Sequence, residues 1–91
     1  MHQERIQEVI TRLQSLEPTH LDVIDESHLH IGHPGAQTGM SHIRIKIASK
    51  QLEGLSKLMQ HKKIYHILGS LMKTDLHAVA IEIIPVNFEQ T

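Results

Sequence analysis

The 91-residue sequence contains no cysteine and no tryptophan, and it has only one tyrosine and one phenylalanine. The absence of cysteine excludes disulfides, thiolate nucleophiles, and zinc or iron–sulfur sites whose sulfur ligands all come from this chain. Any iron–sulfur chemistry must therefore take its thiolates from a partner. The scarcity of aromatic side chains also removes the stacking platform on which many proteins bind single-stranded nucleic acid.

Long apolar segments are missing as well. No stretch approaches the roughly 20 apolar residues that a membrane span requires, and residues 1–4 lack the basic and apolar regions of a secretory signal. We therefore expect a cytoplasmic protein without membrane contact. A chain of 91 residues can bury one core but has no room for a separate catalytic domain, so we expect a single domain over 1–91 that is not an enzyme.

Nine histidines are the most unusual feature of the composition. Neutral imidazole is a common ligand of transition metals, and its ordinary pKa of about 6.5 lies close to physiological pH. His2, His20 and His66 stand alone in the sequence and are predicted to lie on the surface without a ligand role. The other six histidines occur in short motifs, where a binding role is more plausible.

The spacing of apolar residues predicts the secondary structure. Intervals of three and four indicate helices, and the alternation of isoleucine with polar residues over 42–47 indicates a strand with one buried face. Pro18 ends the first helix, and Gly54 separates a helical turn from the long helix that follows. The predicted elements are a helix over 6–16, strands over 20–25 and 43–47, a helical turn over 52–55, a helix over 58–72 and a strand over 76–84.

This αββααβ order predicts an α+β fold in which helices pack on one face of a small three-stranded mixed sheet. The first two strands can pair antiparallel across a long loop at about 26–41, which is rich in histidine and glycine. About 25 residues of mostly helical chain join the last two strands, which is long enough for a right-handed crossover between parallel strands.

Charge is segregated along the chain. Residues 1–26 hold two arginines and six acidic residues, whereas residues 44–73 hold seven basic residues and a single acidic one, Glu53. Such a basic segment can bind nucleic acid or an acidic protein surface. The alternative interpretation is a solvated helix face with no binding role.

The sequence resembles the BolA family over almost the whole chain, and four short motifs carry the resemblance. They are DESHLH at 25–30, SHIR at 41–44, HKKIY at 61–65, seven positions after Gly54, and LHAV at 76–79. Two positions depart from the family pattern. Gln60 and Lys62 flank His61 where arginines are usual, and Leu52 replaces a common aromatic residue.

The resemblance implies a fold similar to class II KH domains and a protein that acts by binding. BolA-like proteins pair with monothiol glutaredoxins and share a [2Fe-2S] cluster with the glutaredoxin and glutathione. The partner would bring the thiolates and this cysteine-free chain the imidazoles. No cofactor is expected in the isolated chain, and a weak homodimer is a further expectation.

His77 matches the C-terminal histidine of the family and is the first candidate ligand. The alternative is a histidine at the edge of the core, in phase with Val79 and Ile81. The second ligand in the family comes from the loop between the first two strands. Here the candidates are His28, His30 and His33: His30 matches the common loop histidine, and His33 is the alternative next to Pro34.

The long helix carries the candidate binding surface. His61 matches the helix histidine of the family and is expected to make a structural hydrogen bond or to face a partner. The other candidate residues of this surface are Lys57, Lys62, Lys63 and Tyr65. A second function is a DNA-binding transcriptional regulator that uses the basic segment 44–73, because Gly54 would separate two helices as in a helix-turn-helix.

Three further patterns indicate other functions more weakly. His28, His30 and His42 could bind Zn²⁺, Ni²⁺ or Cu²⁺, either specifically or adventitiously. The sequence GHPG at 32–35 has the G-x-x-G form with which KH domains hold nucleotides, but it lies between strands. Ser27 beside His28 does not indicate catalysis, because adjacent residues in an extended chain point to opposite sides.

Overall fold

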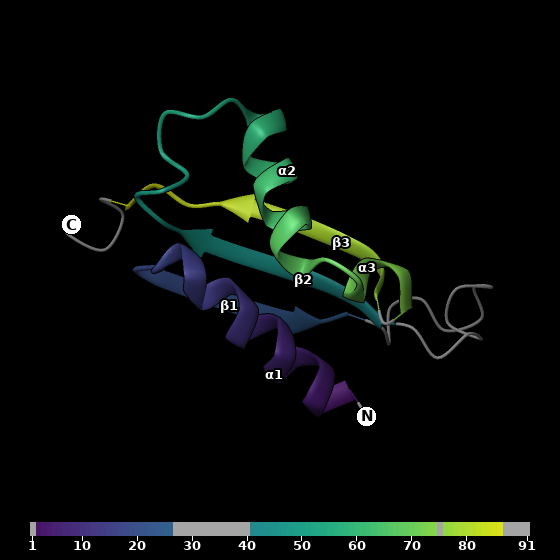
Figure 1. The fold of residues 1–91 in the computed structure, drawn as a ribbon. Helices are drawn as coiled ribbons and strands as arrows, with labels where there is room; N and C mark the ends of the chain where they lie inside the picture. The colour runs from purple at the N-terminus through teal and green to yellow at the C-terminus, as the bar shows by residue number, and fades with distance from the viewer. Residues whose placement is uncertain (1, 27–40, 75, 87–91) are drawn as a thin grey trace.

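The computed structural model describes residues 2–26, 41–74 and 76–86. Three strands form one sheet in the order β1-β2-β3, with β1 antiparallel to β2 and β2 parallel to β3 (Figure 1). This confirms the predicted α+β fold with a three-stranded mixed sheet. The elements are α1 (His2–Leu13), the 3-10 helix η1 (Gln14–Leu16), β1 (His20–Asp25), β2 (Ser41–Ala48), α2 (Lys57–Leu68), α3 (Leu71–Thr74) and β3 (Leu76–Ile83).

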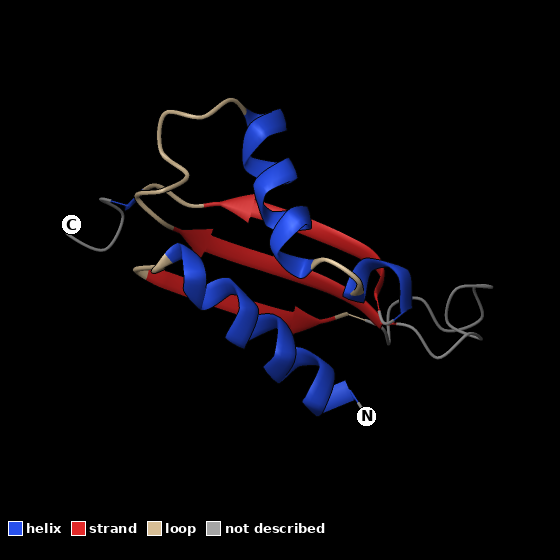
Figure 2. Ribbon diagram, viewed as in Figure 1, coloured by secondary structure: helices blue, strands red, loops and turns tan. Residues whose placement is uncertain are grey.

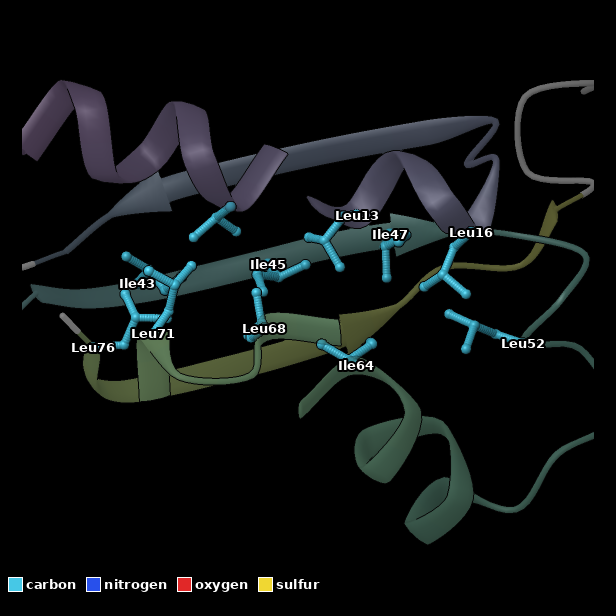
Figure 3. Close-up of a cluster of buried hydrophobic side chains, with 11 residues drawn as sticks. Leu13, Leu16, Ile43, Ile45, Ile47, Leu52, Ile64, Leu68, Leu71 and Leu76 are labelled. Atoms are coloured by element: carbon cyan, nitrogen blue, oxygen red, sulfur yellow. The ribbon is translucent and has the colours of Figure 1, made fainter. Parts of the chain in front are cut away.

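The helices lie on the same face of the sheet, as predicted (Figure 2). The alternation in β2 explains this arrangement, because Ile43, Ile45 and Ile47 are almost fully buried against the helices whereas Arg44 and Lys46 are only half-buried on the opposite face. Figure 3 shows how the helices and β2 meet in the core. The labelled contributors are Leu13, Leu16, Ile43, Ile45, Ile47, Leu52, Ile64, Leu68, Leu71 and Leu76.

The two consecutive helices are not the ones that the sequence predicted. Residues 50–54 form hydrogen-bonded turns rather than a helical turn, and the predicted long helix over 58–72 is interrupted. It ends as α2 at Leu68, because Gly69 adopts φ 54° and ψ −128°, a conformation that breaks the helical hydrogen-bond pattern. The short helix α3 follows, so α2 and α3 supply the two helices of the αββααβ order.

Ser56 determines where α2 begins. Its side chain accepts a hydrogen bond from the backbone N–H of Met59 at 3.2 Å, which is the usual geometry of a serine N-cap. At the other end of α2, the Nη1 of Arg12 in α1 donates to the carbonyl oxygen of Leu68 at 2.8 Å. These two contacts hold α2 across the sheet. Over the described residues, none of the helices combines the length and the apolar character that a membrane crossing needs.

Candidate functional site

The start of β3 is irregular, and His77 lies at the irregularity. Ser41 pairs with Leu76 and His42 pairs with Ala78, so β3 has one more residue than β2 at this point, and that residue is His77. Leu76 is buried, Ala78 is exposed and Val79 is packed against the core, so the alternation of buried positions changes phase here. An extra residue of this kind is rare between parallel strands, and strand irregularities recur next to functional sites.

The segment with the three candidate loop histidines joins the sheet beside His77. It leaves after Glu26 and returns at Ser41, and the N–H of Glu26 donates to the carbonyl oxygen of His42 at 2.8 Å (Figure 1). Ser41 in turn pairs with Leu76, the neighbour of His77. His28, His30 and His33 themselves lie outside the described residues. The fold nevertheless brings both ends of their segment to the strand end that carries His77.

His42 lies in the same region but is buried, with 6% of its surface exposed. It belongs to the candidate set for a Zn²⁺, Ni²⁺ or Cu²⁺ site together with His28 and His30. Within residues 2–26, 41–74 and 76–86, no three His, Asp or Glu side chains come together in a way that could hold a metal ion. The described part of the chain thus provides at most an incomplete ligand set.

The face of the sheet that no described helix covers carries a chain of ion pairs. Arg44 lies 2.9 Å from Glu26 and 3.2 Å from Glu82, and Lys46 lies 3.9 Å from Glu82. The hydrogen bond and charge of Glu26 raise the pKa of the Arg44 guanidinium above its ordinary value. Two of the seven basic residues in 44–73 are therefore already paired with carboxylates.

The outer surface of α2 has a different character. Lys57, Lys62 and Lys63 are exposed, and no ion pair involves them among the described residues. Leu58 is 63% exposed and Met59 is 49% exposed. These two residues belong to the apolar series at helical spacing in the sequence, but Ile64 and Leu68 are the buried residues of α2, and Ile67 packs partly against the core. Sequence reasoning missed this exposed apolar contribution.

His61 and Tyr65 form a ring pair on α2, with centroids 6.4 Å apart and planes at 86°. The Nε2 atom of His61 is buried and has no hydrogen-bond partner among the described residues. The structural hydrogen bond considered for His61 is therefore not formed at Nε2. Tyr65 is 38% exposed and extends the apolar part of the outer surface.

A groove separates the first half of α2 from the last part of β3. Its volume is about 700 Å³. Lys57, Gln60 and His61 line one wall, residues 81–85 line the other, and Lys46 contributes from β2. The side chain of Gln60 donates to the carbonyl oxygen of Leu52 at 2.9 Å, which fixes that part of the wall. The sequence predicted Lys57 and His61 as surface residues but contained no signal for the groove.

Residues 13–87 match the family model of BolA-like proteins. This chain belongs to the BolA-like family. The chloroplastic protein BOLA1 of Arabidopsis thaliana is 37% identical over 75% of this BolA-like chain and 44% of its own length. The solved BolA domain of SufE1 from Arabidopsis thaliana has a TM-score of 0.78 and 32% identity, covering 89% of this chain and 91% of that domain.

A Haemophilus influenzae protein named DNA-binding transcriptional regulator BolA is 29% identical over 86% of this chain and 75% of its own length. The BolA-like chain thus spans less than half of BOLA1 but most of the bacterial protein and of the solved domain. The likeness to these BolA structures confirms the α+β fold. The further likeness to class II KH domains stays a prediction.

The helix-turn-helix interpretation of this BolA-like chain is wrong at Gly54. Residues 49–56 contain no helix, and Gly54 has φ 81° within turns that connect β2 to α2. The joint between two helices lies instead at Gly69, and the second helix has only four residues. The G-x-x-G segment at 32–35 and the pair Ser27 and His28 lie outside the described residues.

Proposed function

We propose that this BolA-like chain is a cytoplasmic adaptor that binds a monothiol glutaredoxin and shares a [2Fe-2S] cluster through histidine ligands. Its role would be in cluster trafficking or in iron and redox signalling. The observation that carries the proposal is the convergence at the start of β3. His77 occupies the extra position of that strand, next to Leu76, which pairs with Ser41 at one end of the segment that contains His28, His30 and His33. The other end of that segment, at Glu26, lies across β2 at the same end of the sheet.

The side chains of this chain can provide half of the ligands of a shared [2Fe-2S] cluster. The chain has imidazoles but no thiolate, and its described residues hold no complete metal site. In this proposal His77 and one histidine among His30, His33 and His28 would hold one iron, while the glutaredoxin and glutathione would provide the sulfur ligands. The cluster would supply one-electron redox chemistry and transferable iron and sulfide. The role of this chain is to present two neutral imidazoles from adjacent backbone segments.

The outer surface of α2 supports binding to a protein. Leu58, Met59 and Tyr65 are exposed beside Lys62 and Lys63. Methionine and tyrosine are enriched in the centres of protein interfaces, and the lysines favour an acidic partner surface at the rim. A surface that combines exposed apolar residues with lysines favours a protein partner, whereas a purely basic surface would favour nucleic acid.

Anaerobic reconstitution with a monothiol glutaredoxin, iron, sulfide and glutathione tests the proposal. We expect a one-to-one complex on a sizing column and a visible circular dichroism spectrum that differs from that of the glutaredoxin alone. His77→Ala should abolish or alter that spectrum. His20→Ala is the matched control, because His20 lies on β1, away from β3, and its Nε2 is 2.9 Å from the carboxylate of Asp22 in the same strand. A spectrum identical in wild type and His77→Ala would remove His77 from the site.

Single alanine variants of His28, His30 and His33 then identify the loop ligand. One of the three should reproduce the loss seen with His77→Ala, and the other two should not. Because a ligating imidazole must be deprotonated, acidification toward pH 5 should release the cluster. A cluster that is indifferent to this change would have ligands other than histidine.

A second candidate function is DNA-binding transcriptional regulation. It is supported by Lys57, Lys62 and Lys63 on α2, which form no ion pair among the described residues, and by the name of the Haemophilus influenzae relative. Replacing all three with glutamine should weaken DNA binding and reduce the slope of its salt dependence by up to about three. An unchanged affinity and slope would exclude this surface as the DNA contact.

A further inference from the structure

The outer edge of β3 has no strand partner among the described residues. β3 is the last strand of the sheet and is eight residues long. Just beyond it, the N–H of Ile84 donates to the carbonyl oxygen of Ile47 in β2 at 2.8 Å. Because backbone groups point to alternate sides along a strand, the N–H and carbonyl groups of Ile81 and Ile83 face away from β2. Such an edge can accept a further strand.

The groove described above runs along this edge. One wall consists of α2 side chains, and the other consists of residues 81–85, which are mainly apolar. In Figure 1, α2 crosses β3 steeply and its first turns stand beside the last part of that strand. At about 3.3 Å per residue, residues 81–85 are long enough to pair with a peptide of four or five residues. A helix beside an open strand edge is a common arrangement for peptide binding by strand addition.

The polar groups in this groove favour a negative charge. Lys57 forms no ion pair among the described residues and lies in the first turn of α2, which has no acidic residue to offset the positive end of the helix dipole. His61 places the buried, unpartnered Nε2 atom in the same wall. The remaining charges, Lys46 and Glu82, lie 3.9 Å apart and offset one another.

We propose that the groove between α2 and the free edge of β3 binds an extended peptide segment with a carboxylate side chain, by strand addition to Ile81–Ile83. The backbone of β3 provides the hydrogen bonds, Lys57 receives the carboxylate, and His61 lines the same wall of the groove. This site lies toward the opposite end of β3 from His77 and is independent of the proposed cluster.

Titration of the ¹⁵N-labelled full chain with short peptides tests the proposal. The probe is the blocked peptide acetyl-Thr-Val-Glu-Val-Thr-amide. One comparison peptide has glutamine in place of the glutamate, and another carries N-methyl groups on alternate residues and so cannot pair along an edge. We expect the amide signals of residues 81–84 and of the first turns of α2 to shift with the glutamate peptide. Binding should weaken with the glutamine peptide. It should disappear when the methyl groups are on the amides that face β3.

Two protein variants test the residues. Lys57→Gln should weaken the affinity for the glutamate peptide by about threefold to tenfold and leave the affinity for the glutamine peptide unchanged. Lys73→Gln, at an exposed lysine of α3 outside the groove, should bind both peptides as the wild type does. Ile83→Pro removes an outward N–H and should prevent binding. If this variant does not fold, Lys57→Gln and the methylated peptide still decide the question.

Two results would overturn the proposal. The first is an absence of shifts at residues 81–84 at peptide concentrations up to about 1 mM, which corresponds to a binding free energy weaker than about 4 kcal/mol. The second is concentration-dependent self-association that protects the β3 edge without peptide, because the occupant would then be a second copy of this chain.

Discussion

The two ends of β3 differ in what they offer to a partner. At its start, the strand carries an extra residue, His77, and adjoins a long segment rich in histidine. At its end, the strand is regular, has no strand partner on its outer edge among the described residues, and lines a groove together with Lys57 and His61 of α2. From His77 to Ile84 the strand extends about 23 Å, at about 3.3 Å per residue. The two proposals therefore use opposite ends of one strand, a side-chain ligand at its start and backbone hydrogen bonds at its end.

This difference has a structural cause. α2 enters the sheet face over the last part of β3 and is anchored by Ile64 and Leu68, so the groove depends on how firmly α2 is held. The start of β3 is instead held by β2, through the pairing of Ser41 with Leu76. Changes in α2 should therefore affect the groove end more strongly than the His77 end.

The largest effect is expected from Ile64→Ala. Ile64 is fully buried in the core, and its truncation should lower the free energy of unfolding by about 2–5 kcal/mol, as measured by urea denaturation. Amide hydrogen exchange should accelerate more in α2 than in β1 and β2, because only α2 loses its anchor. The conservative control Ile64→Val should cost about 0.5–1.5 kcal/mol. Equal costs for the two variants would mean that Ile64 does not hold α2.

Gly69→Ala is expected to cost about 1–3 kcal/mol, because Gly69 has φ 54° and ψ −128°, which side-chain-bearing residues rarely adopt. The new Cβ would also lie 3.3 Å from Nη1 of Arg12, which holds the end of α2. Gly54→Ala is the matched comparison, since Gly54 has φ 81° but open space around its missing Cβ. Thermal unfolding should show a smaller loss of stability for Gly54→Ala than for Gly69→Ala. The reverse order would contradict the inference that Arg12 holds the end of α2.

Much of the fold could be predicted because β2 and α1 have clear periodicity. The isoleucines of β2 alternate cleanly, and the strand and its pairing followed from them. Leu52 and Leu55 misled the prediction, because their spacing of three is also produced by turns. The turn in which the N–H of Leu52 donates to the carbonyl oxygen of Ser49 buries Leu52 without any helix.

The candidate site was less predictable. The sequence singled out His77, but nothing in its pattern revealed the extra residue in β3, since a bulge depends on pairing with β2. The groove depends on where α2 crosses the sheet, which local spacing does not determine. Leu58 and Met59 look like core residues in the sequence, and only the tertiary structure shows that no described element covers them. The ligand roles of His28, His30 and His33 stay predictions.

Ser56→Ala should affect the groove end selectively. Loss of the N-cap hydrogen bond to Met59 should lower stability by about 0.5–2 kcal/mol in urea denaturation and loosen the first turn of α2. Ser56→Asp should keep the cap and the stability, but its carboxylate lies next to Lys57 and should compete with an acidic peptide. If Ser56→Asp bound the glutamate peptide as tightly as the wild type, the charge preference of the groove would lie elsewhere.

The smallest effect is expected from the ion pairs on the uncovered face, which link the two ends of the sheet through Arg44. Arg44 contacts Glu26 near the start of β2 and Glu82 near the end of β3, and the side chains of Arg44 and Glu82 are 34% and 49% exposed. A double-mutant cycle of Arg44→Met and Glu82→Gln should therefore give a coupling of about 0.2–1 kcal/mol. The guanidinium of Arg44 is protonated between pH 5 and 9 even without a partner, and Glu26 and Glu82 raise its pKa further, so salt rather than pH is the useful variable. The coupling should vanish at about 1 M salt, where the Debye length is about 3 Å. A coupling that survives this salt concentration would show that the ion pair is shielded from solvent. Arg44 would then link Glu26 and Glu82 more strongly than the exposed fractions of the side chains indicate.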